Sequence, residues 1–148
     1  MTWKPHLTVA ALIENDGRFL MVQENISGKS VYNQPAGHLE DKETLLDAVI
    51  RETREETAWH FEPKFISGIY HWRHPDKDKT FIRVSFAGQG LYHDPACQLD
   101  NGIERTLWLT PEELGRQADR LRSPMVLRSI EDYLAGTSYP LSLLTSLE

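Results

Sequence analysis

The sequence predicts an α/β or α+β sandwich built on a mixed β-sheet. Extended and helical segments follow one another in the order ββ–α–ββ–β–α–α, which lacks the strict alternation of a doubly wound fold. No repeat, low-complexity tract or linker interrupts this order, so we expect residues 1–148 to form a single domain. A chain of 148 residues can also bury enough apolar surface to fold without disulfides.

The first two strands are expected to form a hairpin. Residues 6–13 (HLTVAALI) are apolar and β-branched, and residues 18–24 (RFLMVQE) follow after the turn sequence ENDG. Residues 25–40 are rich in turn formers and predict a loop with at most a short strand. A helix is predicted from about Thr44, whose hydroxyl can cap the first turn together with Asp47.

The second half of the chain predicts three strands and two helices. The strands are residues 65–72, 81–91 and 103–109, and the polar sequence RHPDKDK connects the first two. Two helix starts follow, each with a capping side chain and then a proline, and they fall at Thr110 and Ser123. In the first, Glu113 completes a capping box; the second helix is expected to stop at Gly136.

Composition excludes several classes of protein. Cys97 is the only cysteine, so an intrachain disulfide and a cysteine-based zinc cluster are ruled out. The net charge of −6 disfavours a nucleic-acid polymer or an anionic membrane as partner. The N-terminal segment has no signal-peptide pattern, and no apolar run reaches the roughly 18 residues that span a bilayer. We therefore expect a cytoplasmic protein and, by preference, a monomer.

The predicted helix from Thr44 carries acidic residues on the face that should pack on the core. At about 100° per residue, the acids continue the apolar stripe instead of opposing it. The apolar positions are Leu45, Ala48 and Val49, and the acidic positions are Glu52, Glu55 and Glu56. Negative charge at the carboxyl end of a helix is unfavourable, which indicates a compensating cation. Carboxylates without His or Cys favour Mg²⁺ or Mn²⁺, although a network of these acids with Arg51 and Arg54 is the alternative.

The polar positions of this segment resemble a known family motif. Gly37 is followed after five residues by Glu43, and after seven more by Arg51-Glu52 and Glu55-Glu56. This spacing resembles the box of the Nudix (MutT-like) hydrolases, G-x5-E-x7-R-E-U-x-E-E-x-G-U. The family's fold is a mixed sheet between helices, with the box forming a loop–helix–loop.

Two positions depart from the family pattern. Thr53 stands where an aliphatic residue is usual, and Ala58 replaces the closing glycine. Since glycine is the residue best suited to a left-handed helix cap, the exit turn is expected to differ locally.

Further segments resemble the NudJ-type phosphatases within the family. They are KPHLTVA near the start, NQPAGHLE before the box and LRSPMV with YPL towards the end. This resemblance implies Mg²⁺-dependent hydrolysis of nucleoside tri- and diphosphates and of thiamine or hydroxymethylpyrimidine pyrophosphates, by water attack on phosphorus. The alternatives are a Nudix pyrophosphohydrolase for dinucleoside polyphosphates or oxidised deoxynucleotides, and a non-catalytic nucleotide-binding sensor.

The resemblance also implies roles for individual residues. Metal ligands would be Glu52, Glu55, Glu56 and the backbone carbonyl of Ala36. Arg51 would orient Glu55, while Glu43 and Gly37 would shape the loop. The general base would be a glutamate of the box, with Glu52 as first candidate, or an acid on a distant loop. Glu104 is our candidate for that distant acid, and an ordinary surface glutamate is the alternative.

A basic and aromatic segment is the candidate substrate-binding region. Arg73, Lys79 and Arg83 could bind phosphate, and Trp72 could stack on a ring. The alternative is a solvated connector between two strands. His38, next to the glycine of the box, either approaches the substrate or packs in the loop.

Overall fold

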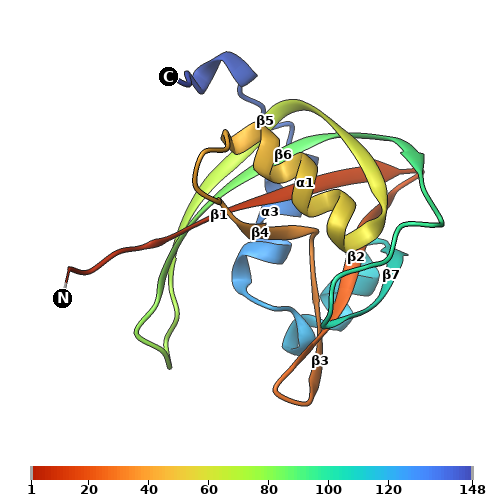
Figure 1. Ribbon diagram of the computed structural model, residues 1–148. Coiled ribbons are helices and arrows are strands. Elements are labelled where there is room, and N and C mark those ends of the chain that lie inside the picture. Colours follow the sequence, from red (N-terminus) through yellow and green to blue (C-terminus); the bar gives the residue numbers. More distant parts are fainter. Residues whose placement is uncertain (1, 148) are drawn as a thin grey trace.

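The computed structural model describes residues 2–147 as one mixed sheet with helices on both faces (Figure 1). The strand order is β3-β2-β1-β6-β5, with β4 paired to β1 and β7 paired to β2. The strands are β1 (His6–Asn15), β2 (Arg18–Ile26), β3 (Lys29–Asn33), β4 (Ala36–His38), β5 (Trp59–Arg73), β6 (Thr80–His93) and β7 (Ile103–Leu109). The helices are α1 (Leu45–Thr57), α2 (Pro111–Arg116) and α3 (Pro124–Leu134), with 3₁₀ turns at Ala118–Arg120 and Leu141–Leu143. The predicted sandwich on a mixed sheet is confirmed.

Strand β1 makes the sheet mixed. It runs parallel to β6 from the pair His6–Phe81 to the pair Ile13–Gly88, and antiparallel to β4. Its end also pairs antiparallel with the start of β2, which is the predicted hairpin. Because β1 is buried on both faces, its sequence is a continuous apolar run and does not alternate.

Each face of the sheet supports its own core. Side chains of successive strand residues point to opposite faces, so Val9 and Ala11 join one core and Leu12 joins the other. Helix α1 covers the first core with Ala48 and Val49. Helices α2 and α3 cover the second. Layers of this kind fix α1 firmly against the sheet and so set the position of its acidic end.

The region 25–40 was expected to be a loop with at most one strand, and this was wrong. It forms β3, which pairs with β2, and β4, which pairs with β1. The turn formers Ser27 and Gly28 occupy only the β2–β3 turn, with φ of 52° and 83°. Val31 and Tyr32 are buried in β3 beyond that turn. Composition averaged over the segment therefore hid two short strands.

Strands β5 and β6 are longer than predicted. The alternating pattern of β5 is broken by register shifts near Phe61, Phe65 and Gly68, and by Pro63 between them. Such bulges change which residues face the core, so the period of two is lost in the sequence. Strand β7 has the predicted bounds.

Both ends of α1 are defined by specific hydrogen bonds. As predicted, the Thr44 hydroxyl accepts the Asp47 N–H at 3.1 Å. Thr53 is fully buried, and its hydroxyl donates to the Val49 carbonyl at 2.7 Å, so the departure from an aliphatic residue is accommodated. Ala58 nevertheless adopts the left-handed conformation, with φ 64° and ψ 11°. The expected local difference at the exit turn is therefore absent, and the alanine takes the glycine-type turn at a cost of about 1–2 kcal/mol.

The predicted caps of α2 and α3 are confirmed. The Thr110 hydroxyl accepts the Glu113 N–H, and the Glu113 carboxylate accepts the Thr110 N–H. Ser123 caps α3, and Gly136 follows its end with φ 86°. Among the described residues, no helix is long and apolar enough to cross a membrane.

Candidate active site

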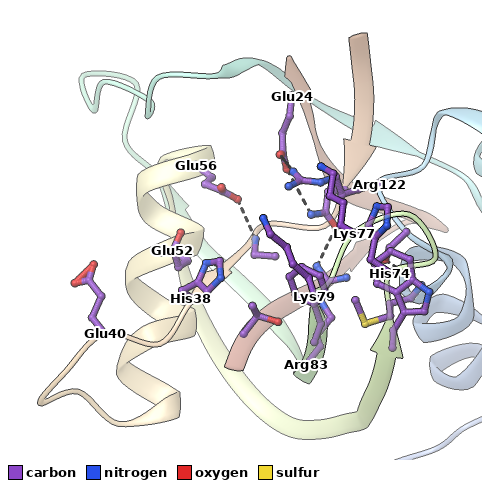
Figure 2. A pocket seen from close by; sticks show the side chains of 18 residues that line it. Glu24, His38, Glu40, Glu52, Glu56, His74, Lys77, Lys79, Arg83 and Arg122 are labelled. Atoms are coloured by element: carbon purple, nitrogen blue, oxygen red, sulfur yellow. Dashed lines mark hydrogen bonds and ion pairs between the residues drawn. The ribbon is translucent and has the colours of Figure 1, made fainter. Parts of the chain in front are cut away.

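A cavity of about 410 Å³ lies beside the acidic end of α1 (Figure 2). Glu52 and Glu56 reach it from the helix, and the residues of β4 line it next to them. In Figure 2, Lys79 extends towards these acids from the connection between β5 and β6, and Arg122 lies beyond it. Acidic and basic side chains from distant parts of the chain thus line one cavity.

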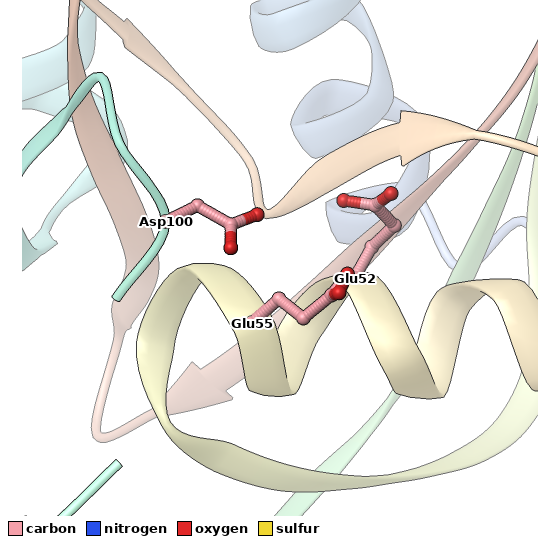
Figure 3. Close-up of side chains that lie close together, drawn as sticks. All are labelled: Glu52, Glu55 and Asp100. Carbon is pink, nitrogen blue, oxygen red and sulfur yellow. The ribbon is translucent and has the colours of Figure 1, made fainter. Parts of the chain in front are cut away.

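A second group of acids adjoins the first (Figure 3). One carboxylate oxygen each of Glu52, Glu55 and Asp100 lies within 4.8 Å of the other two. Asp100 comes from the loop between β6 and β7, and its backbone N–H donates to the Glu55 carbonyl at 3.0 Å. This bond holds the loop on α1. Glu52 belongs to both groups of acids, because it lines the cavity and also lies next to Glu55 and Asp100.

Burial makes the ionised forms of Glu56, Glu52 and Asp100 unfavourable without a cation. It raises the pKa of Glu56 to about 9, and the charges of Glu24, Glu52 and Asp100 add to that effect. Burial is also the main cause that raises the pKa of Glu52 and of Asp100. Oxygen ligands whose ionised forms need compensation fit a hard divalent cation.

The backbone of β4 is held on the helix at Ala36. Its N–H donates to Glu56 Oε1 at 2.9 Å, and Ala36 lines the cavity. The structure thus places Ala36 against Glu56, one of the carboxylates with which the family resemblance groups it.

Arg51 connects four groups around the acids. Its Nη1 donates to Glu52 and Glu55, each at 2.8 Å. Its Nε and Nη2 donate to the Glu43 carboxylate at 3.0 and 2.7 Å, and Nη2 also reaches the His38 carbonyl at 3.1 Å. These bonds raise the pKa of Arg51 and, conversely, lower that of Glu43. The guanidinium therefore ties the loop before α1 to both acids.

Glu43 also stabilises the loop directly. Its carboxylate accepts the Glu40 backbone N–H at 2.8 Å, in addition to the two bonds from Arg51. Its geometry corresponds to the bracing position that the family resemblance implies.

Gly37 leaves room for the Glu52 carboxylate against β4. A Cβ on Gly37 would lie 2.1 Å from the Glu52 carboxyl carbon, where no side-chain atom fits. Glycine thus lets β4 approach the Glu52 carboxylate, which points across the strand into the cavity.

Four of the five candidate substrate residues line the cavity. These are His38, Trp72, Lys79 and Arg83. The fifth, Arg73, does not: it is exposed and pairs with Asp78 at 2.9 Å. Adjacent residues of a strand point to opposite sides, so Trp72 and Arg73 cannot both face the cavity.

Glu104 lies apart from the acids of α1. Its carboxylate accepts the Ser30 hydroxyl at 2.6 Å and the Gln23 amide at 2.9 Å, on the exposed side of β7. It is not among the residues that line the cavity. Asp100, four residues earlier, reaches the acids in its place. Both are acids next to a strand start, and no sequence signal separates them.

Other cavity residues were missed by sequence reasoning. Glu24, Asn33 and Arg122 come from β2, the end of β3 and the turn before α3. Each is a polar residue in or next to a segment typical of a strand or a helix start, with no motif around it that indicates a site. Their grouping depends on strand pairing, which the sequence pattern did not specify.

Comparison with known proteins agrees with this architecture. Residues 4–128 match the NUDIX domain. Phosphatase NudJ of Escherichia coli K12 is 42% identical over 142 residues, which cover 96% of this chain and 92% of that protein. A NUDIX hydrolase from Nitrosomonas europaea superposes with a TM-score of 0.95 at 43% identity, over 97% of this chain and 98% of that one. The NUDIX domain of Shewanella oneidensis NrtR, solved with ADP ribose, is similar in fold at 19% identity, with a TM-score of 0.70 over 91% and 90% of the two chains.

The mixed sheet, the loop–helix segment and the relatives define a hydrolase of phosphate-containing acid anhydrides. The chain belongs to the Nudix family.

The first prediction concerns Gly37. Gly37→Ala should lower kcat by about 100-fold, because its Cβ displaces the Glu52 carboxylate. Gly115→Ala is the matched control, since a Cβ there meets nothing within 4 Å. Steady-state kinetics on a nucleoside triphosphate, with circular dichroism to verify folding, measures the effect. Unchanged turnover in folded Gly37→Ala would contradict it.

The second prediction concerns pH and Glu56. Because its pKa rises from an ordinary 4.5 to about 9 on folding, the folded protein retains a proton that the unfolded chain has lost. The free energy of unfolding of the metal-free protein should therefore fall between pH 5 and pH 9, by at most about 1.4 kcal/mol per pH unit from this group.

Glu56→Gln removes this contribution, so its stability should depend less on pH. Urea denaturation in EDTA at pH 6 and pH 8, for both proteins, measures the difference. Equal slopes in the two proteins would show that Glu56 is not the group responsible.

Proposed function

We propose that this chain hydrolyses nucleoside tri- and diphosphates, and thiamine or hydroxymethylpyrimidine pyrophosphates, by divalent-metal-dependent attack of water on phosphorus. The observation that carries the proposal is the division of the cavity. Glu52 and Glu56 line it from α1, and the basic residues Lys77, Lys79 and Arg122 line it from the β5–β6 connection and the turn before α3. Such a cavity suits a polyphosphate, whose charge needs both bound cations and basic side chains.

Carboxylates of the site would hold the metal, which we propose to be Mg²⁺, with Mn²⁺ able to substitute. The ligands would be Glu52, Glu55, Glu56 and the Ala36 carbonyl, together with Asp100. When bound, the metal supplies charge neutralisation at the phosphate oxygens and a lowered pKa of water.

The chain's own side chains position the reactants. Arg51 holds Glu52 and Glu55 in place through its two bonds of 2.8 Å. Lys79 binds phosphate oxygens from the opposite side of the cavity, and Trp72 provides a ring on which the leaving group can stack. The proton of the attacking water passes to a carboxylate, either Glu52 or Asp100. Asp100 thus replaces Glu104, the distant acid expected from the sequence.

Two relatives support the substrate class. Phosphatase NudJ is similar over nearly the whole chain, and the NrtR domain of the same fold was solved with ADP ribose, a nucleoside diphosphate derivative. The net charge of −6 favours a small phosphate ester over a nucleic-acid polymer. We further propose that residues 1–148 act as one Nudix hydrolase domain, as a monomer.

The third prediction tests the reaction. With Mg²⁺, the protein should release phosphate or pyrophosphate from a panel of nucleoside tri- and diphosphates, thiamine pyrophosphate, dinucleoside polyphosphates and oxidised deoxynucleotides. Phosphorus NMR in ¹⁸O water identifies both the product and the phosphorus attacked. Glu56→Gln should lose at least 100-fold in kcat, and Glu62→Gln, on the exposed part of β5, should lose nothing. Binding without release from any substrate would instead identify a non-catalytic sensor.

The fourth prediction separates the two distant acids. Asp100→Asn should lower kcat more than tenfold and weaken Mg²⁺ binding, because Asp100 lies within 4.8 Å of Glu52 and Glu55. Glu104→Gln should leave both unchanged, since its carboxylate bonds to Ser30 and Gln23 and does not line the cavity. Kinetics across a Mg²⁺ titration measures both constants. The reverse order of effects would restore Glu104 as the distant acid.

A further inference from the structure

We propose that Glu24 selects the leaving group of the substrate, by accepting a hydrogen bond from an amino group on a heteroaromatic ring. The preferred ring would carry this amino group next to an unprotonated ring nitrogen, as in cytosine and adenine. The inference rests on the proposed function and names a residue that the hydrolytic step itself does not use.

Glu24 is a carboxylate buried in the cavity wall. Its residue is 9% exposed, and it reaches the cavity from β2 (Figure 2). Oε2 accepts from Arg122 Nη1 at 2.5 Å, and Oε1 accepts from the Asn33 amide at the long distance of 3.4 Å. Since two carboxylate oxygens can accept about four hydrogen bonds, Glu24 keeps acceptor capacity for a ligand.

The neighbours of Glu24 provide donors. Asn33 Oδ1 accepts from Arg83 Nη2 at 2.9 Å, and this bond turns the Asn33 amide nitrogen towards Glu24. That nitrogen has a second N–H to offer. Arg83 is 3% exposed, so its bond to Asn33 is buried and holds the amide in this orientation. An acceptor flanked by donors is therefore fixed in the cavity wall.

The same cavity has an aromatic wall. Trp72 stacks with Phe81 at 5.8 Å between ring centroids, and Met125 also lines the cavity. A volume of about 410 Å³ is within the range of small-molecule sites. A flat ring can lie on these side chains while its edge reaches polar groups, which is the arrangement that ring recognition requires.

The edge pattern decides which rings fit. An exocyclic amine would donate to Glu24, and the adjacent ring nitrogen would accept from Asn33 or Arg122. A ring with an oxo group and a ring N–H at these positions exchanges donor and acceptor at both. Its carbonyl oxygen would face the Glu24 carboxylate, and its N–H would face the donors. Since the buried groups then stay unpaired, we expect discrimination of about 10- to 100-fold.

A purely structural role for Glu24 gives different expectations. The pair with Arg122 would then only tie β2 to the turn before α3. Removing it would lower stability and affect all substrates equally, with no dependence on the ring. Substrate pairs that differ only in amino and oxo groups separate the two roles.

The fifth prediction uses such pairs. In the wild-type protein, kcat/KM should be at least tenfold higher for CTP than for UTP, and for ATP than for ITP. In Glu24→Gln, both ratios should fall to within about threefold of one. Glu62→Gln is the matched surface control and should keep the wild-type ratios. Tripolyphosphate, which has no ring, should be hydrolysed equally by wild type and Glu24→Gln.

A binding measurement keeps the inference independent of turnover. Calorimetry with α,β-methylene analogues of CDP and UDP should show at least tenfold tighter binding of the cytosine compound to wild type. Equal affinities and equal kcat/KM values for the pair would overturn the role of Glu24, as would ratios that persist in folded Glu24→Gln. Absence of hydrolysis for every substrate, tripolyphosphate included, would instead overturn the proposed function, and the affinities would still test Glu24.

Discussion

The hydrogen bonds of Arg51 are the interaction on which the site depends. One guanidinium contacts Glu43, Glu52 and Glu55 and the carbonyl of His38. Without this cation, the carboxylates of Glu52 and Glu55 in the last turns of α1 and of Glu43 in the loop beside them would repel one another, and the helix macrodipole would add to the cost for the two on the helix. Arg51 therefore makes the acidic end of α1 compatible with folding, and at the same time it fixes the loop that forms the cavity wall.

The close approach of β4 to α1 completes this arrangement. Gly37 allows the contact with Glu52, and the Ala36 N–H bonds to Glu56. The hydrophobic half of α1 makes both possible, because Ala48 and Val49 are fully buried against the sheet. The same helix therefore packs on the core with its first half and positions the acids of the site with its second half. A change in core packing that shifts α1 also shifts these acids.

How far the sequence predicts the molecule depends on how local each feature is. The box from Gly37 to Ala58 could be placed by its spacing, since helical periodicity puts Glu52, Glu55 and Glu56 near one another. The caps at Thr110 and Ser123 were equally local and were predicted. The two strands within 25–40 were missed because their pairing with β1 and β2 is long-range. Glu104 was chosen over Asp100 for the same reason, because only the path of the β6–β7 loop separates them.

The same distinction divides the cavity itself. Three of the acids proposed for catalysis, Glu52, Glu55 and Glu56, occupy one helix, so their relative positions follow from a repeating backbone geometry. The polar groups proposed for selection meet only through the tertiary fold, since Glu24 lies on β2, Asn33 at the end of β3 and Arg122 in the turn before α3. A substitution in one of these strands changes the edge pattern presented to a ring without moving α1. Catalytic acids centred on α1 and selecting groups on other elements can therefore vary separately, which allows one reaction to serve different leaving groups.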